Sequence, residues 1–311
     1  MSKLRGKVVL VTGGGGFLGE RIIERLDLHN TADVLVPRSW DWDLTSQAQT
    51  AQLFKEAKPD VVIHAAAEVG GIGANMKSPG RFLYANAMMG LNVIEQARIA
   101  ETPKVVVVGT VCSYPKYAKP PFVEEGLWAG YPEETNAPYG VAKKMLLVQA
   151  EAYAQQYGMN IAYVIPTNLY GPGDNINPDT SHVIPAIMRK CIEAKRSGSD
   201  LVTLWGTGEA SREFLYVDDA AEGIVRAAAK NVPTLPINLG AGAEITIKTL
   251  AIMIARVVGY EGKFAWDDSK PDGQPRRSVN AQRAFDLLGW ESKISLAEGL
   301  DRTYRWMASE V

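Results

Sequence analysis

The stretch Val-Thr-Gly-Gly-Gly-Gly-Phe-Leu-Gly, residues 11–19, decides the fold class. It sets glycines at 13, 16 and 19, in the spacing GxxGxxG, between an apolar run at 7–11 and a segment that predicts a helix over 17–28. Glycine lets the chain turn tightly and approach a ligand, and the first turn of a helix offers unpaired N–H groups to an anion. The stretch therefore predicts a phosphate-binding loop. The plainer alternative is a glycine-rich turn without a ligand.

Strand and helix patterns alternate outward from this loop through the first half of the chain. Strands are predicted at 33–36, 60–65, 104–108 and 160–165, and helices at 47–57, 82–100 and 139–157. Continuous β-branched runs indicate strands buried on both faces, which is typical of a parallel sheet covered by helices. We therefore expect an α/β, doubly wound Rossmann fold.

The pattern changes after Pro166. Gly, Pro, Asn and Asp cluster in PTNLYGPGDNINPDTSH, and long loops of this kind inside a compact domain are usually functional. A helix over 183–194 and short strands in LVTLW and INLG follow. We expect a dinucleotide-binding domain over 1–166, with interleaved returns near 212–240, and a smaller C-terminal lobe over 167–311 that binds mainly substrate.

Bulk composition narrows the class of protein. The chain has 311 residues and a net charge of −2, which gives no basic field for nucleic acid and no polybasic membrane anchor. Two cysteines are too few for a disulfide framework and favour a reducing compartment. The basic N-terminus is interpreted as a first strand, not a signal peptide. We expect a cytoplasmic protein that contacts neither membrane nor nucleic acid and has no metal site.

Arg38 bears on which dinucleotide is bound. An NAD site usually has an acidic residue at the end of the second strand, where it binds the ribose 2′-OH. Here Arg38 follows that strand, and a guanidinium suits the 2′-phosphate of NADP. The sequence favours NADP(H), although Asp41 and Asp43 lie close by and Arg38 could be a solvated surface residue.

Tyr139 and Lys143 stand four residues apart in APYGVAKK, so they share one face at the start of a helix. An ammonium beside a phenol stabilises the phenolate, so we expect Lys143 to lower the pKa of Tyr139. Such a tyrosine can transfer a proton while a hydride moves at an adjacent carbon. Thr110, at the end of the fourth strand, supplies a hydroxyl beside it. The alternative for the pair is an exposed helix face.

Cys112 lies just past the run Val105–Val108. Its thiol could serve only to pack the interior, or it could take part in catalysis. Cys191, within MRKCIEA, is expected to be a small buried hydrophobic residue. Residues alone leave both possibilities open for Cys112, and His182 could equally be a solvated loop histidine.

The motifs together resemble the extended short-chain dehydrogenase/reductases, and within them the GDP-L-fucose synthases. The first resemblance rests on the glycine loop, Tyr139 with Lys143, HAAA (64–67), Asn86, REFLYVDD (212–219) and NLGAG (238–242). The second rests on AAAEVGGIGANMKSP (65–79), GTVCSYPK (109–116), PTNLYGPGDNINPDTSHVIPA (166–186) and KPDGQPRR (270–277). It covers almost the whole chain.

This resemblance implies an NADPH-dependent enzyme that converts GDP-4-keto-6-deoxy-D-mannose to GDP-L-fucose. The implied activity is that of a 3,5-epimerase and 4-reductase, in which a Cys acts as the base and a His as the acid. Cys112 and His182 match those positions. A positive neighbour can favour a reactive thiolate, and Tyr139 would protonate O4 after hydride transfer. A homodimer through the helices near 82–100 and 139–157 is also implied.

The remaining site residues come from the same resemblance. The implied catalytic residues are Thr110, Cys112, Tyr139, Lys143 and His182. The implied cofactor-binding residues are Gly13, Gly16, Phe17, Leu18, Gly19, Arg38, Asp43, Leu44, Ala65, Ala66, Tyr139, Lys143, Pro166, Asn168, Leu169 and His182. The implied substrate-binding residues are Asn168, Lys190, Trp205, Arg212 and Lys270.

Departures from the family pattern keep alternatives open. Gly15 stands where some members carry an Arg for the 2′-phosphate, and Lys190 stands where an Arg contacts the nucleotide. Lysine keeps the charge but loses the bidentate geometry. Trp205 could be core, and Arg212 could pair with Glu213 at the surface. The alternatives are a related nucleotide-sugar epimerase or 4-ketoreductase with another sugar or base, and a non-catalytic NADP-binding regulator.

Overall fold

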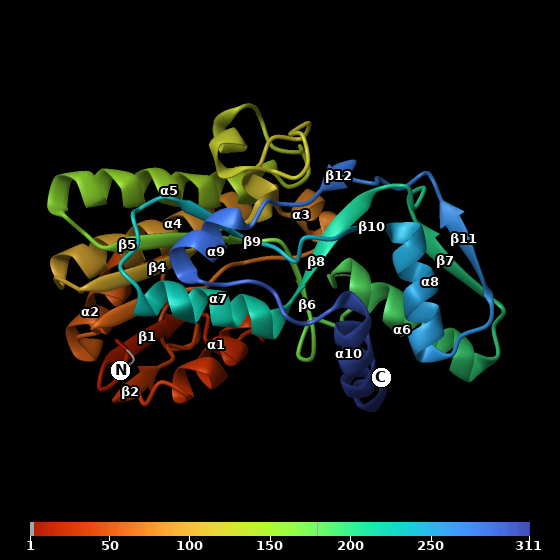
Figure 1. The fold of residues 1–311 in the computed structure, drawn as a ribbon, viewed down its shortest axis with the longest axis horizontal. Coiled ribbons are helices and arrows are strands. Elements are labelled where there is room, and N and C mark those ends of the chain that lie inside the picture. Colours follow the sequence, from red (N-terminus) through yellow and green to blue (C-terminus); the bar gives the residue numbers. More distant parts are fainter. Residues whose placement is uncertain (1–2, 179) are drawn as a thin grey trace.

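A computed structural model describes residues 3–178 and 180–311, and within them the chain forms a six-stranded parallel sheet beside a smaller lobe (Figure 1). The strand order is β2-β1-β3-β4-β5-β9. The strands are β1 (Val8–Thr12), β2 (Asp33–Leu35), β3 (Val61–His64), β4 (Lys104–Val108), β5 (Ile161–Pro166) and β9 (Pro236–Leu239). The predicted doubly wound α/β fold is confirmed.

Helices cover both faces of this sheet. On one face lie α1 (Phe17–Asp27), α7 (Val217–Ala229) and α9 (Gln282–Leu288), and on the other α2 (Gln47–Ala57), α4 (Pro79–Ile99) and α5 (Ala137–Tyr157) (Figure 1). Alternate residues of each strand enter opposite cores, as with Val9 and Leu10 of β1. Burial on both faces explains why these strands are continuous apolar runs.

Two helices begin earlier than their apolar pattern indicates. The helix expected from Phe82 starts at Pro79, and the one expected from Tyr139 starts at Ala137, followed by Pro138. Proline favours the first helical turn because its missing N–H has no partner to lose there. A short helix, α3 (Ile72–Lys77), precedes α4 and closes the loop after β3.

The smaller lobe is built around β8 (Ser211–Tyr216). This strand pairs with β6 (Asn168–Tyr170), β10 (Glu244–Thr246) and β12 (Arg276–Arg277), while β7 (Leu201–Trp205) pairs with β11 (Lys263–Asp267). A third apolar core joins these strands to α6 (Val183–Ser197), α8 (Ile247–Val258) and α10 (Leu296–Glu310).

The chain crosses between the two parts more than once. β8 belongs to the smaller sheet, α7 and β9 then return to the large sheet, and α9 packs there again after β12. The carboxyl end of the large sheet therefore faces the smaller lobe, so residues far apart in sequence meet at that edge. Among the described residues, no helix has the length and apolar character needed to cross a bilayer.

Candidate active site

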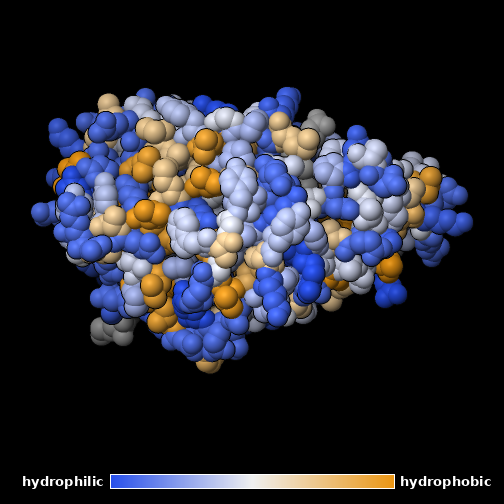
Figure 2. All heavy atoms as spheres, turned by 90° about the horizontal axis from the view of Figure 1, so that it is seen from above, coloured by the Kyte–Doolittle hydropathy of each residue, from blue (hydrophilic) through white to orange (hydrophobic). Residues whose placement is uncertain are grey.

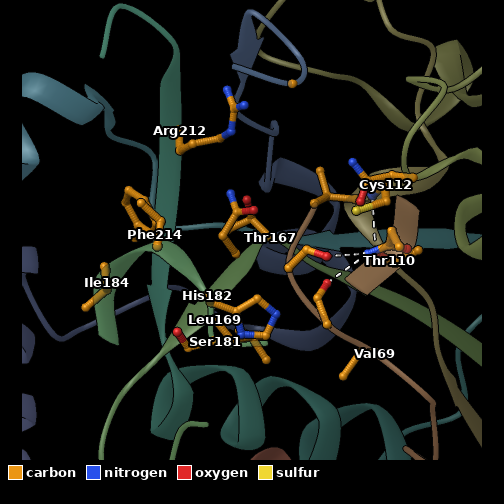
Figure 3. A pocket seen from close by; sticks show the side chains of 18 of the residues that line it. Val69, Thr110, Cys112, Thr167, Leu169, Ser181, His182, Ile184, Arg212 and Phe214 are labelled. Carbon is orange, nitrogen blue, oxygen red and sulfur yellow. Dashed lines mark hydrogen bonds between the residues drawn. The ribbon is translucent and has the colours of Figure 1, made fainter. Parts of the chain in front are cut away.

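A cavity of about 660 Å³ opens at the carboxyl edge of the large sheet, between that sheet and the smaller lobe. Its walls come from the β1–α1 loop, the ends of β4 and β5, the start of α5, α6, and β8. Figure 3 shows Thr110 and Cys112 on one wall, His182 and Leu169 on another, and Arg212 farther along the cavity. Cavities at this edge are the usual ligand sites of doubly wound folds.

The glycine loop has room for nothing larger than glycine at two positions. Gly13 has φ +74°, and a Cβ there would lie 2.7 Å from Cα of Ala66. A Cβ on Gly19 would lie 2.1 Å from the carbonyl oxygen of Gly13. Gly16 is the N-cap of α1 and places no side chain over the helix end. The first N–H groups of α1 are thus open to an anion in the cavity.

Arg38 is exposed but folds back over this loop. A Cβ on Gly15 would come within 1.4 Å of Nη1 of Arg38, so the guanidinium occupies the space that a side chain at position 15 would take. Its Cζ also lies 5.7 Å from the centre of the Trp40 ring. Glycine at position 15 therefore leaves the space that the Arg38 guanidinium occupies.

Thr110, Tyr139 and Lys143 form a cluster at the end of β4. The Thr110 hydroxyl accepts a hydrogen bond from N–H of Cys112 at 3.2 Å and also hydrogen-bonds the Tyr139 phenol. Nζ of Lys143 donates to the carbonyl oxygen of Ala66 at 3.3 Å, and burial lowers the pKa of Lys143 to about 8.

The prediction that Lys143 lowers the pKa of Tyr139 is wrong in this structure. Burial of the phenol and the nearby Cys112 raise the pKa of Tyr139 above its usual value, and the hydrogen bond with Thr110 only partly opposes this shift. Removing the phenol from water disfavours its charged form more than its neighbours favour it. Tyr139 is protonated at neutral pH, as an unshifted phenol also is, and this is the state of a proton donor.

Cys112 reaches the cavity from η1 (Val111–Ser113), a single 3-10 turn after β4. The thiol is half-buried, and Nη1 of Arg277 donates toward its Sγ at 3.6 Å. The same nitrogen donates to Oδ1 of Asn168 at 3.2 Å, and Nε of Arg277 donates to Oε1 of Gln274 at 3.0 Å. A fixed cation thus faces the sulfur. Cys191, by contrast, is fully buried, and burial raises the pKa of its thiol to about 12.

Gly140 brings Cys112 and Tyr139 together. A Cβ on Gly140 would lie 2.4 Å from the carbonyl oxygen of Cys112, so α5 and η1 touch backbone to backbone. The Ser113 hydroxyl donates to the Gly140 carbonyl at 2.8 Å and fastens the contact. The phenol of Tyr163 donates to the Lys143 carbonyl at 2.8 Å one turn later.

His182 is the N-cap residue of α6, yet its side chain makes no capping bond. Its imidazole lines the cavity and is 44% exposed, with Nδ1 3.4 Å from Oδ1 of Asp174. Burial lowers the pKa of His182, but the hydrogen bond and charge of Asp174 outweigh this effect and raise it above 6.5. Asp174 itself is only 2% exposed.

Residues predicted for the substrate occupy the far end of the cavity. Arg212 donates to the carbonyl oxygens of Ser211 and Asp272, and burial together with Arg277 lowers its pKa to about 9. Glu213 is instead turned away and accepts from N–H of Val279 and Gly242, so the surface pair considered for Arg212 does not form.

Lys190 and Trp205 lie at the open rim. Nζ of Lys190 donates to the Thr203 carbonyl at 2.8 Å. Trp205 is 55% exposed, with Nζ of Lys270 5.6 Å from its ring centre, so the indole is not a core residue. Its face is available for stacking.

The cavity gathers most of the predicted site residues. Those that line it are Gly13, Gly16, Phe17, Leu18, Gly19, Ala65, Thr110, Cys112, Tyr139, Lys143, Pro166, Asn168, Leu169, His182, Lys190, Trp205 and Arg212. The others, Arg38, Asp43, Leu44, Ala66 and Lys270, lie outside its lining. Asn86 holds the loop after β3 by accepting from N–H of Glu68 and donating to its carbonyl.

Sequence reasoning missed Arg277, Asp174 and Gly140. Arg277 lies within the quoted run 270–277 and Asp174 within 166–186, so both were visible as parts of motifs. Arg277 meets Cys112 across 165 positions of sequence, which no local pattern could reveal.

Comparisons with known proteins agree with this geometry. Residues 9–240 match the NAD dependent epimerase/dehydratase family, and the chain belongs to that family. Within it, the chain is 40% identical to GDP-L-fucose synthase 1 of Arabidopsis thaliana, over 97% of this chain and 94% of that protein. It is 39% identical to GDP-L-fucose synthase of Escherichia coli (strain K12), over 98% of this chain and 97% of that one.

A solved structure of a GDP-L-fucose synthetase also resembles this chain. The crystal structure of a GDP-L-fucose synthetase from Naegleria fowleri bound to NADP is 29% identical and matches with a TM-score of 0.90, covering 100% of this chain and 95% of that one. The resemblance to the GDP-L-fucose synthases predicted from the motifs is confirmed.

Proposed function

We propose that the chain is an NADPH-dependent enzyme that inverts C3 and C5 of GDP-4-keto-6-deoxy-D-mannose and reduces C4, forming GDP-L-fucose. The observation that carries this proposal is the meeting of Cys112, His182 and Tyr139 with the glycine loop in one cavity. An ordinary ketoreductase needs the tyrosine and the loop, but it has no use for a cavity-facing thiol and imidazole. The GDP-L-fucose synthases that resemble the chain end to end support the same activity.

The residues present fit NADP(H). The backbone at Gly13 and Gly19 leaves a cradle that any Cβ would fill, the start of α1 is uncapped, and Arg38 lies over the loop. These groups would hold the pyrophosphate and the 2′-phosphate. Lys143 and the loop 65–66 would hold the nicotinamide half. When bound, NADPH supplies the hydride for C4.

Cys112 and His182 would carry the epimerisations. The C–H bonds at C3 and C5 are acidic because the 4-keto group accepts the electron pair as an enolate. The thiolate of Cys112 takes the proton from one face, and the imidazolium of His182 gives a proton to the other. Each inversion leaves a neutral thiol and a neutral imidazole, which return to their starting states by exchange with solvent. Nη1 of Arg277 lies 3.6 Å from Sγ and places a positive charge beside the sulfur.

Tyr139 would complete the reduction. Its phenol, protonated at neutral pH, hydrogen-bonds the developing negative charge on O4 and then gives it the proton. Thr110 fixes the phenol by its hydrogen bond.

The nucleotide would lie toward the smaller lobe. Arg212 and Lys190 supply positive charge for the diphosphate, Asn168 supplies hydrogen bonds, and Trp205 with Lys270 offers a stacking surface for the base. This division supports the assignment of 1–166, with returns near 212–240, to cofactor binding and of 167–311 mainly to substrate.

Two further proposals concern the whole protein. The exposed large apolar side chains on α4 and α5 include Leu83, Tyr84, Val141, Met145 and Val148. Figure 2, which views the molecule from above, shows orange patches on the half that holds the large sheet. Apolar patches of this kind mark protein interfaces, so a homodimer through these helices is proposed. The two free cysteines support a cytoplasmic location.

The test is incubation with NADPH and a panel of nucleotide 4-keto sugars. We expect NADPH absorbance to fall with GDP-4-keto-6-deoxy-D-mannose, with one NADPH consumed per sugar, and GDP-L-fucose to be identified by NMR. Reduction without inversion would make the protein a simple 4-ketoreductase. Turnover of another sugar or base alone would reassign the substrate, and cofactor binding without turnover of any member would support a regulator.

A further inference from the structure

The loop between β6 and α6 contains a buried carboxylate that the mechanism above does not use. Asp174 is 2% exposed, and its Oδ1 accepts a hydrogen bond from N–H of Asn175 at 2.7 Å. Its Oδ2 is buried with no hydrogen-bond partner among the described residues. A carboxylate buried in this way is costly unless an opposite charge lies beside it. The imidazole of His182, at 3.4 Å, is the group in that position.

The loop holds these two side chains in a fixed relation. N–H of Asp174 donates to the Gly171 carbonyl, and Nδ2 of Asn175 donates to Oγ1 of Thr180 at 2.9 Å. N–H of Gly71 reaches the Thr180 carbonyl from the loop after β3. His182 then begins α6 by accepting from N–H of Ala186 at 3.0 Å. Both ends of the loop are therefore tied down.

The pairing orients the imidazole. Because Asp174 meets Nδ1 from the buried side, Nε2 is the nitrogen left for a ligand in the cavity. A carboxylate that accepts from Nδ1–H also stabilises the doubly protonated ring, in which Nε2–H is a proton donor. The contact with Asp174 thus sets both the direction in which Nε2 of His182 points and the charge of the imidazole.

Resting on the proposed function, we propose that Asp174 is a positioning residue that aims Nε2 of His182 at the sugar ring and keeps that imidazole protonated for the second half of each inversion. The partially exposed imidazole reaches the cavity, while the buried carboxylate stays behind it.

Other charged or titratable groups share the cavity with His182, and the pH behaviour must be weighed against them. They come from η1, α5, α6, β8, the loop before β12 and β12 itself: Cys112, Tyr139, Lys143, Lys190, Arg212, Asp272 and Arg277. Most of these are cations and would favour the neutral ring. The hydrogen bond and charge that act on His182 come from Asp174, which lies outside the cavity lining.

The first test uses NMR on the full-length chain without substrate. The chain has three histidines, so the His182 resonance is identified as the one missing from His182→Gln. Asp174→Asn keeps the shape and an acceptor oxygen but removes the charge. We expect the midpoint of the His182 titration to fall by about one pH unit, which is about a tenfold change in proton affinity. An unchanged midpoint would overturn the proposal.

Asn175→Ala is the matched control, because it loosens the same loop through its bond to Thr180 but leaves the carboxylate in place. Its His182 midpoint should stay at the wild-type value. An equal fall in both variants would mean that the loop, and not the charge of Asp174, acts on the imidazole, and would overturn the proposal. Should Asp174→Asn fail to fold, the nitrogen NMR chemical shifts of the neutral His182 ring in the wild-type protein still test the pairing. They show which ring nitrogen carries the proton: a proton on Nδ1 supports the pairing with Asp174, and a proton on Nε2 contradicts it.

The second test separates exchange from inversion in deuterated water. Loss of the acid leaves Cys112 able to remove a proton and return deuterium to the same face. For Asp174→Asn we therefore expect exchange at C3 and C5 within about twofold of wild type, while inversion falls about tenfold or more near pH 8 and recovers at lower pH. Equal loss of exchange and inversion at every pH would overturn the proposal. If no nucleotide sugar were epimerised even by wild type, the proposed function would fail, while the NMR titration would still report on the Asp174–His182 pair.

Discussion

Single residues decide which chemistry the cavity supports. The Tyr139 phenol is buried and hydrogen-bonds Thr110, and burial raises its pKa, whereas the Cys112 thiol is half-buried with the guanidinium of Arg277 3.6 Å from its Sγ. The phenol and the thiol thus lie in different surroundings on neighbouring elements. This separation matches a site in which one group must remove a proton and the other must deliver one.

Tyr139→Phe should stop reduction while epimerisation partly survives. The substitution removes the proton for O4 but leaves Cys112 and His182 in place, so NADPH oxidation should fall by about 10²–10⁴-fold. Solvent deuterium should still enter C3 and C5, measured by mass spectrometry of the recovered sugar. Undiminished NADPH oxidation would remove Tyr139 from the proposed role.

Arg38→Ala should weaken the preference for NADPH. A charged hydrogen bond to phosphate is worth about 1.5–3 kcal/mol, so the Kd for NADPH should rise about 10- to 100-fold while the Kd for NADH changes little. Gly15→Ala should act in the same direction, because its Cβ would displace the guanidinium. Parallel titrations with both cofactors measure this. Equal weakening for both would show that Arg38 does not read the 2′-phosphate.

Site residues could be predicted from the sequence where they lie close together along the chain. Tyr139 and Lys143 share a helix face, so their spacing alone indicated a common site. Arg277 reaches Cys112 only because β12 pairs with β8 beside the large sheet, and a pairing of distant strands has no local signature. The pKa of Tyr139 was mispredicted because burial of the phenol, which depends on the whole fold, raises it, and the hydrogen bond with Thr110 offsets that shift only in part.

Elements set the distances between these side chains. The backbone contact between Gly140 of α5 and Cys112 of η1 keeps the thiol and the phenol on one side of the cavity. The strands of the large sheet were predictable because burial on both faces requires continuous apolar residues. The short strands of the smaller lobe carry no such pattern, and two-residue β12 could not be predicted at all.

Gly140→Ala should impair both reactions without abolishing cofactor binding. Its Cβ would push α5 away from η1, and a displacement of about 1 Å can cost about 10²-fold in rate. Gly80→Ala on α4 is the control, because a Cβ there meets nothing within 4 Å. We expect steady-state turnover to fall only for the Gly140 variant. Unchanged turnover would mean that the tight contact does not position the residues.

The whole molecule places the six-stranded sheet and the smaller lobe on either side of one cavity. Because the chain crosses between them several times, the lobes cannot be divided by a single cut in the sequence. The cavity could be predicted from the fold class, since ligands of doubly wound sheets bind at the carboxyl edge. The smaller lobe's contribution, Asp174 and Arg277 above all, required the three-dimensional arrangement.

Val148→Glu should dissociate the proposed dimer. Val148 is 48% exposed on α5, and a charge there would be buried without a partner at the interface. Ile252→Glu on α8, at 49% exposure, is the matched control in the other lobe. Sedimentation velocity should show a dimer for wild type and Ile252→Glu, and a monomer for Val148→Glu. A monomeric wild type, or a dimeric Val148→Glu, would exclude this interface.

Deuterium incorporation during turnover in deuterated water reports on both proposed inversions at once. We expect GDP-L-fucose from the wild-type protein with solvent deuterium at C3 and C5 and none at C4, because C4 receives hydride from NADPH. We expect Cys112→Ser to lose incorporation at both carbons and yet to bind NADPH with unchanged affinity. Incorporation at wild-type rates by Cys112→Ser would show that the thiol is not the base.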